Sequence, residues 1–262
     1  MDSLLDKIVS ITHEAGKIAL ECQKNGFKSY KKGHNDIVTD ADLKVNNYLK
    51  HSLLGLLPEA GWLSEESIDD KKRLNKKFVW IVDPIDGTFQ FSKGSDEWCI
   101  SIALIENQKP IIGVIYNPRK EQMFFAERCL GAFLNDYRIK NTPTKINKKP
   151  IILTTKSKRN FFNILTHGLN KIFHVEQIGS LAYILALTSS GYASSCITFK
   201  PANEWDIAAG FLLLKESGCS FKILGNQENT DGFIFNKKDV YYKKGFFGAS
   251  KSMYEILKNK IN

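Results

Sequence analysis

The sequence contains Phe78-Val79-Trp80-Ile81-Val82-Asp83-Pro84-Ile85-Asp86-Gly87-Thr88, an apolar run that ends in two carboxylates, a proline, a glycine and a hydroxyl. The apolar residues predict a buried strand, and Pro84 disfavours a helical Asp83, so we expect the strand to close there. Gly87 allows a tight turn, and Thr88 can cap the segment that follows. Two acids beside free amides are compatible when cations lie between the acids and an anion lies on the amides. The stretch therefore indicates a metal-dependent phosphate site, although an Asx turn alone is an alternative explanation of the two aspartates.

The length and composition predict an ordinary globular protein. With 262 residues and 43% hydrophobic content, the chain suits one large domain or two closely joined halves. We expect an N-terminal α+β half at 1–145 and a C-terminal α/β half at 146–262, which together close one active site. The five cysteines are odd in number and widely spaced, which favours reduced thiols. The acidic start and the lack of a membrane-spanning apolar run predict a cytoplasmic protein without a membrane partner.

The net charge of +9 comes almost entirely from lysine. Lysine gives diffuse charge, whereas arginine gives the forked recognition that phosphate backbones favour. The lysines form short pairs without a basic helix or aromatic platforms between them, which argues against nucleic-acid binding. We interpret the excess as a solvated surface that also attracts small anionic substrates.

The first part of the chain predicts two capped helices and a connecting loop. An amphipathic helix begins after Ser3, and Thr39 caps a second helix whose first turn carries Asp40 and Asp42. The segment 58–67 is expected to be a loop, and the charged run 69–77 an exposed connection. Glu65 precedes the Asp83 strand closely, so a hairpin-like return could set the two acids side by side.

The rest of the chain predicts an antiparallel meander followed by α/β layering. The meander strands are expected at 98–105, 110–116 and 122–126, with a further edge at 131–135. The second half predicts strands at 151–154 and 172–175 and helices at 160–169, 179–187, 205–217 and 251–258. In this pattern Asp206 would be a plain helix N-cap.

Three acidic motifs occur in an order that resembles the inositol monophosphatase superfamily. They are Ser64-Glu65-Glu66-Ser67, the segment from Asp83 to Thr88 quoted above, and Trp205-Asp206-Ile207-Ala208-Ala209-Gly210. The resemblance covers nearly the whole chain. It implies a layered αβαβα sandwich of the α+β class, with an antiparallel N-terminal sheet and a mixed C-terminal sheet.

The resemblance also implies roles for individual residues. It implies that two or three Mg²⁺ ions are held by the side chains of Glu65, Asp83, Asp86 and Asp206 and by the carbonyl of Ile85. Oxygen ligands without cysteine or histidine are consistent with Mg²⁺. The implied catalytic residues are Glu65 and Thr88, which orient the attacking water, and Asp42, which acts through waters on the third ion. The implied substrate contacts are Gly87, Thr88, Gly179, Ser180, Lys200 and Asp206.

The sequence favours one substrate within this superfamily. Leu63-Ser64-Glu65-Glu66 and 201–206 resemble the CysQ-type 3'(2'),5'-bisphosphate nucleotidases, and Lys200 suits a second phosphate. We therefore expect 3'-phosphoadenosine 5'-phosphate as the substrate, with inositol 1-phosphate as the alternative. Gln90 decides neither way.

A function of another class stays open. The basic charge would permit an RNA- or protein-binding regulator of the same fold. An intact set of acids argues against it, because those acids would repel phosphate backbones unless loaded with metal. The resemblance further implies a homodimer.

Overall fold

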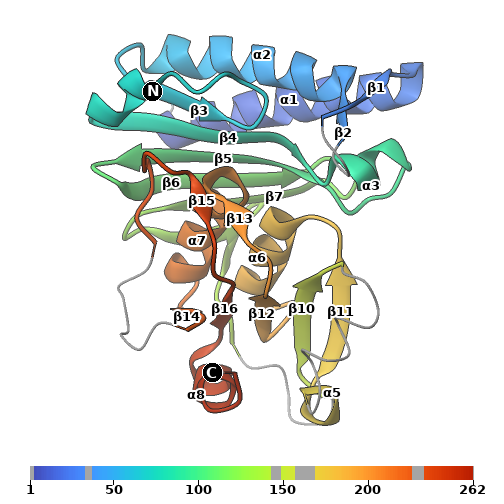
Figure 1. The fold of residues 1–262 in the computed structure, drawn as a ribbon, viewed down its shortest axis with the longest axis vertical. Helices are drawn as coiled ribbons and strands as arrows, with labels where there is room; N and C mark the ends of the chain where they lie inside the picture. Colours follow the sequence, from blue (N-terminus) through green and yellow to red (C-terminus); the bar gives the residue numbers. More distant parts are fainter. Residues whose placement is uncertain (1–2, 33–36, 143–148, 157–168, 226–232, 262) are drawn as a thin grey trace.

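The computed structural model describes residues 3–32, 37–142, 149–156, 169–225 and 233–261. Its elements stack as helices, sheet, helices, sheet, helices from one end of the molecule to the other (Figure 1). The first layer contains α1 (Leu4–Asn25) and α2 (Asp40–Leu56), which begin at the predicted caps Ser3 and Thr39. A short antiparallel pair, β1 (Ser29–Lys31) and β2 (Ile37–Thr39), joins these two helices.

The second layer is a seven-stranded sheet with the order β3-β4-β5-β6-β7-β8-β9. Its strands are β3 (Gly61–Ser64), β4 (Phe78–Asp86), β5 (Cys99–Glu106), β6 (Lys109–Asn117), β7 (Gln122–Glu127), β8 (Gly131–Leu134) and β9 (Tyr137–Ile139). The meander from β5 to β8 matches the prediction. A five-residue helix, α3 (Thr88–Ser92), follows β4.

Two features near β4 differ from the predictions made from the sequence. Residues 61–64, expected to lie in a loop, form the buried strand β3, which pairs with β4 in parallel rather than through a hairpin-like return. In addition, β4 continues through Pro84 to Asp86, and its register with β5 shifts between Asp83 and Asp86. Pro84 has no N–H to donate to β5, so the register shift lies where β4 cannot form a regular backbone hydrogen bond.

The connection between β3 and β4 is exposed over much of its length, as predicted, and Arg73 is the exception. It contains a short 3₁₀ helix, Lys71–Asn75, in which Arg73 is only 2% exposed. The guanidinium binds the Asp69 carboxylate with two hydrogen bonds of 2.7 and 2.9 Å and the Asn236 side chain at 2.6 Å. Because these partners satisfy its donors, the arginine can be buried.

The C-terminal part forms a mixed five-stranded sheet with the order β11-β10-β12-β16-β14. Its strands are β10 (Ile151–Thr155), β11 (His174–Ile178), β12 (Ser195–Thr198), β14 (Ser220–Ile223) and β16 (Phe246–Ala249). The remaining elements are α5 (Leu169–Ile172), α6 (Leu181–Ser189), β13 (Ala202–Asn203), α7 (Glu204–Glu216), β15 (Tyr241–Tyr242) and α8 (Lys251–Lys258). The helix predicted at 160–169 lies largely outside the described residues, and the strand predicted at 172–175 begins two residues later.

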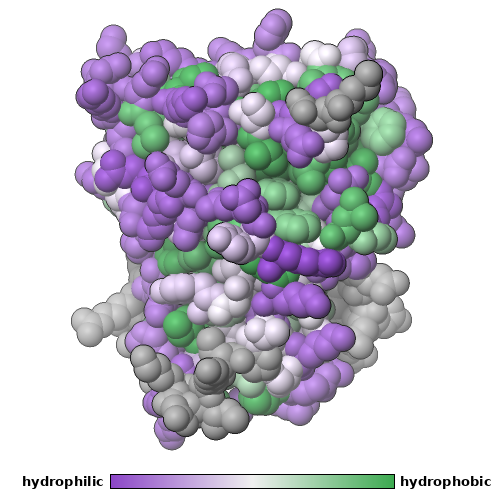
Figure 2. Space-filling model, turned by 180° about the vertical axis from the view of Figure 1, so that it is seen from behind, coloured by the Kyte–Doolittle hydropathy of each residue, from purple (hydrophilic) through white to green (hydrophobic). Residues whose placement is uncertain are grey.

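Three hydrophobic clusters separate the five layers. One lies between α1, α2 and the seven-stranded sheet, a second surrounds α6 and α7 between the sheets, and a third lies between the five-stranded sheet and α8. Seen from behind, hydrophobic side chains gather near the level of the seven-stranded sheet, while hydrophilic side chains cover most of the rest (Figure 2). Among the described residues, no helix combines the length and the apolar character needed to span a membrane.

Strand β6 packs closely on α7 at Gly113. A Cβ added there would lie 2.8 Å from the Ala209 carbonyl oxygen and 3.1 Å from the Ala209 Cα. We expect Gly113→Val to lower the free energy of unfolding by about 2 kcal/mol or more, because neither backbone can yield cheaply. Urea unfolding measures this, with Gly55→Val as the matched control, since nothing lies within 4 Å of the position of its Cβ. Equal stability of the two variants would contradict the packing argument.

Candidate metal and phosphate site

Three acidic side chains from distant parts of the chain meet at one point. A carboxylate oxygen from each of Glu65, Asp83 and Asp206 lies within 4.8 Å of the others. Glu65 follows β3, and its N–H donates to the Val82 carbonyl at 3.2 Å, which extends the parallel pairing and sets it beside Asp83. The predicted proximity of Glu65 and Asp83 is therefore confirmed, although parallel strands produce it.

Asp206 reaches this cluster from the first turn of α7. The helix begins after Asn203, so Asp206 is its third residue and not the plain N-cap that the sequence suggested. The Asn203 N–H donates to Asp206 Oδ2 at 2.8 Å, which fixes the carboxylate. Ser101, the residue of β5 opposite Asp83, donates to the Trp205 carbonyl at 3.2 Å. Strand β5 thus holds the start of α7 against Asp83.

The electrostatics of the cluster favour a bound cation. Asp83 is 2% exposed, and burial raises its pKa well above the ordinary value, with further increases from Glu65, Asp86 and Asp206. The Lys32 ammonium, 3.5 Å from Glu65 and 2.8 Å from Glu66, is a cation that the sequence analysis missed. The donors at the meeting point of the three acids are carboxylate oxygens without sulfur or imidazole nitrogen, so the residues fit Mg²⁺.

Asp86 is the last residue of β4 and binds the start of α6. Its Oδ2 accepts hydrogen bonds from the Ser180 hydroxyl at 2.7 Å and from the Ala182 N–H at 2.6 Å. Burial raises the Asp86 pKa to about 6, although these hydrogen bonds act in the opposite direction. Asp86 is outside the group of three close carboxylates, yet its charge raises the Asp83 pKa. Its role as a metal ligand stays a prediction.

The residues predicted to bind substrate at 179–180 are close to Asp86. Ser180 is fully buried, and its hydroxyl caps α6 by accepting from the Tyr183 N–H at 3.1 Å. Its described contacts therefore position Asp86 and α6. The Gly179 N–H donates to Glu97 at 2.9 Å. Substrate contact by Gly179 and Ser180 stays a prediction.

The turn after β4 brings Thr88 beside Asp42. Gly87 has a φ of +97°, and a Cβ there would lie 2.9 Å from the Glu97 carbonyl, so glycine is required. The Thr88 hydroxyl lies 3.0 Å from both Asp42 Oδ1 and the Ile85 carbonyl. Because its single proton serves one of these acceptors, the oxygen can still accept a hydrogen bond from a water.

Asp42 has a structural role that the sequence did not reveal. Its Oδ2 accepts from the Thr39 N–H at 2.8 Å in a capping box, while Oδ1 faces Thr88. The side chain is 1% exposed, and burial raises its pKa to about 6. Asp42 thus couples the start of α2 to the turn that carries Thr88.

Two lysines lie at the carboxyl ends of the parallel strands β10 and β12. The Lys200 ammonium donates to the Lys156 carbonyl at 2.6 Å, and the Lys156 ammonium pairs with Glu97 at 2.7 Å. Glu97 also accepts from Gly179, so this group lies beside the N-terminus of α6. Sequence reasoning identified Lys200 but missed Lys156 and Glu97, which stand in segments without a motif.

Comparisons with known proteins agree with this geometry. The family model described as the inositol monophosphatase family matches residues 1–259. An inositol-1-monophosphatase of Rhizobium meliloti is 32% identical over 225 residues, which cover 82% of this chain and 84% of the relative. The Nus factor SuhB of Xylella fastidiosa is 30% identical, with coverages of 73% and 72%.

A solved structure carries the same arrangement of elements. The extragenic suppressor protein suhB of Bartonella henselae superposes with a TM-score of 0.85 at 26% identity and covers 98% of both chains. This similarity confirms the predicted fold class.

Proposed function

Because the chain belongs to the inositol monophosphatase family, we propose that it hydrolyses small phosphate monoesters with two or three Mg²⁺ ions held by Glu65, Asp83, Ile85, Asp86 and Asp206. Members of this family are metal-dependent phosphatases, so the predicted enzyme class is confirmed. The observation that carries the proposal is the meeting of Glu65, Asp83 and Asp206 within 4.8 Å.

The side chains around the cluster supply the remaining parts of a phosphatase. Divalent ions there would offset the charge of the phosphate and lower the pKa of an attacking water. Thr88, held by Asp42, and Glu65 each offer an oxygen that can accept a hydrogen bond and so orient that water. The first amides of α3, after Gly87, lack intrahelical partners and can donate to the phosphate oxygens.

For the substrate we propose inositol monophosphate first. The Rhizobium meliloti relative is named an inositol-1-monophosphatase, and neither relative described above is named a bisphosphate nucleotidase. The comparisons therefore do not support the expected closeness to CysQ-type enzymes. One observation still favours 3'-phosphoadenosine 5'-phosphate as a second candidate: the neighbouring Lys156 and Lys200 near Gly179 could bind a second phosphate.

A side-by-side assay distinguishes the two substrates. We expect phosphate release from inositol 1-phosphate to exceed that from phosphoadenosine phosphate in kcat/KM, and both to vanish with chelator. If Lys200 binds a second phosphate, Lys200→Met lowers kcat/KM for the bisphosphate by about tenfold and leaves inositol 1-phosphate unchanged, because it removes one charge-assisted contact.

The matched control is Lys251→Met, which removes a lysine at the exposed start of α8. A preference for the bisphosphate that depends on Lys200 would replace inositol phosphate as the proposed substrate. Phosphate release from neither compound in Mg²⁺ would contradict the proposed function itself.

A further inference from the structure

A cavity of about 700 Å³ lies beside α7, beyond the first turn that carries Asp206. It is formed by the β5–β6 turn, by the later turns of α7 and by the segment 233–242. Its lining residues are Asn107, Gln108, Lys109, Pro110, Arg128, Phe211, Leu212, Lys215, Ile223, Phe233, Ile234, Lys237 and Tyr242. None of them is a residue of the acidic cluster described above. Its size suits a ligand as large as a nucleotide.

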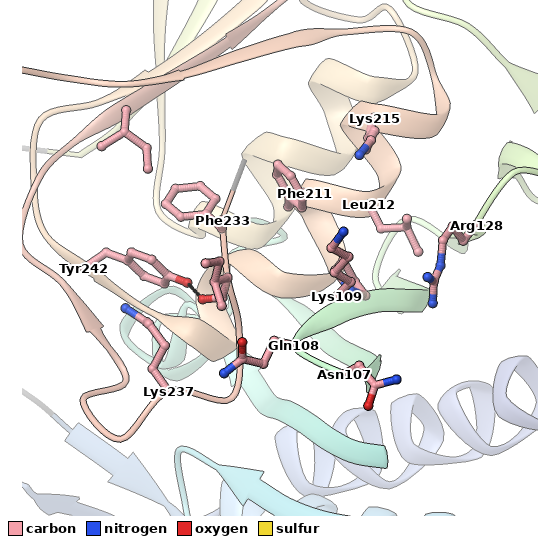
Figure 3. Close-up of a pocket in the computed structure, with 13 residues that line it drawn as sticks. Asn107, Gln108, Lys109, Arg128, Phe211, Leu212, Lys215, Phe233, Lys237 and Tyr242 are labelled. Carbon is pink, nitrogen blue, oxygen red and sulfur yellow. Dashed lines mark hydrogen bonds between the residues drawn. The ribbon is translucent and has the colours of Figure 1, made fainter. Parts of the chain in front are cut away.

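The charged side chains among the described lining residues are all positive. Of the described residues that line it, four are cationic, Lys109, Arg128, Lys215 and Lys237, and none carries a carboxylate. Among the described residues, Lys109 and Lys215 are exposed and take part in no ion pair, while Arg128 is paired with Glu106 at 3.1 Å. Figure 3 shows Lys109, Lys215 and Arg128 on one side of the aromatic side chains and Lys237 on the other. The arrangement favours an anion that extends across the opening.

The floor of the cavity is aromatic and already ordered. The Phe211 and Phe233 rings pack edge to face with centroids 5.7 Å apart, and Tyr242 packs against Phe233 at 4.4 Å. The Tyr242 hydroxyl donates to the Ile234 carbonyl, which fixes that ring (Figure 3). The Lys237 ammonium lies 3.5 Å from the Tyr242 ring centroid, and partial burial lowers its pKa. An apolar planar group could pack on this floor with little rearrangement.

Two carboxamides complete the lining. Asn107 and Gln108 form the β5–β6 turn, and each has a positive φ, of 47° and 66°. Their backbones are tied down, because the Asn107 N–H donates to the Lys77 carbonyl at 3.0 Å and the Gln108 carbonyl accepts from the Phe235 N–H at 3.0 Å. A carboxamide offers both a donor and an acceptor, which matches the edge of a nucleobase.

From these three features we infer that the cavity binds a nucleoside diphosphate, with its phosphates on Lys109, Arg128 and Lys215 and its base on the aromatic floor beside Gln108. Inorganic phosphate alone would leave the floor uncovered, and an uncharged apolar ligand would leave Lys109 and Lys215 without an ionic partner among the described residues. Since α7 carries both Asp206 and three residues of the lining, the occupied cavity would contact the helix that completes the acidic cluster.

The test is calorimetric titration of the full chain with ADP in the presence of chelator. Without divalent ions the acidic cluster repels phosphate, so ADP binding measured in chelator reports the cavity beside α7. We expect a 1:1 complex whose dissociation constant rises at least tenfold in Lys109→Glu/Lys215→Glu. The control Lys44→Glu/Lys50→Glu makes the same change in net charge on the exposed face of α2 and should leave binding unchanged.

Absence of ADP binding, equal loss in both double variants, or pyrophosphate that binds as tightly as ADP would overturn the inference. Unchanged ADP binding in Asp83→Asn would support it, because that variant alters only the acidic cluster. Failure of phosphate release in Mg²⁺ leaves this result unaffected, so the two proposals can fail separately.

Discussion

Asp83→Asn is expected to reduce Mg²⁺-dependent phosphate release by at least about a thousandfold, because it removes a charged oxygen from the centre of the cluster. Asp83 is the residue against which Glu65, Asp86 and Asp206 all exert their charge. The same substitution should stabilise the metal-free protein, since it removes one of several buried like charges. We expect the melting temperature in chelator to rise by about 2 °C or more. The stabilisation that Mg²⁺ gives the wild type should shrink in the variant.

The two measurements together separate a metal site from an ordinary structural cluster. Asp136→Asn is the matched control, because Asp136 is an exposed aspartate in the turn between β8 and β9, at the opposite edge of the sheet from β3. It should change neither activity nor the response to Mg²⁺. Near-normal phosphate release by Asp83→Asn, or a loss of stability in chelator, would show that the acids are not a cation site.

Arg73→Ala is expected to lower the free energy of unfolding by about 3–5 kcal/mol, the usual cost of removing one partner from a buried charged network. The arginine binds Asp69, the Asn236 side chain and the Lys237 carbonyl, the last at 3.0 Å. The N–H groups of Asn236 and Lys237 donate in turn to the fully buried Glu204 at 2.6 and 2.9 Å. Glu204 stands two residues before Asp206, so the network reaches the start of α7.

Thermal unfolding should show a decrease of about 10 °C for Arg73→Ala. The surviving folded enzyme should need more Mg²⁺ for half-maximal activity, because Asp206 loses its support. Arg73→Lys keeps the positive charge but loses the two-pronged guanidinium that binds both oxygens of Asp69. Its melting temperature should therefore lie between those of the wild type and Arg73→Ala. Arg119→Ala removes an exposed arginine and serves as the control. A melting temperature of Arg73→Ala within about 2 °C of the wild type would contradict this account.

Local signals in the sequence predicted much of the fold. Ser3 and Thr39 cap helices because their hydroxyls accept hydrogen bonds from N–H groups of the first turn. Such an interaction spans at most four residues, so the local sequence is enough to predict it. The meander was predictable for the same reason, since its turns join neighbouring strands. Strand β3 was missed because four residues are too few to show a period, and its partner lies across the crossover that contains Arg73.

The site was predictable only in part. The pattern of charges predicted that Arg73 lies at the surface. Its buried partner Asn236 is distant in the sequence, so no local signal indicates their contact. The spacing of motifs could not bring Asp206 to Asp83; only the resemblance implied that contact, and the structure confirms their proximity. Lys32, Lys156 and Glu97 carry no motif, since their positions follow from tertiary packing alone.

The position of α7 between the two sheets has a consequence for biosynthesis. The helix packs on β5 and β6 through one face, and the residues that pair with β13 before it follow much later, at Tyr241–Tyr242. A nascent polypeptide that has been synthesised only as far as the meander contains Glu65 and Asp83. It still lacks Asp206, the third acid of the cluster. The acidic cluster can therefore be completed only after translation has passed Asp206 and the strand at Tyr241–Tyr242 that pairs with β13.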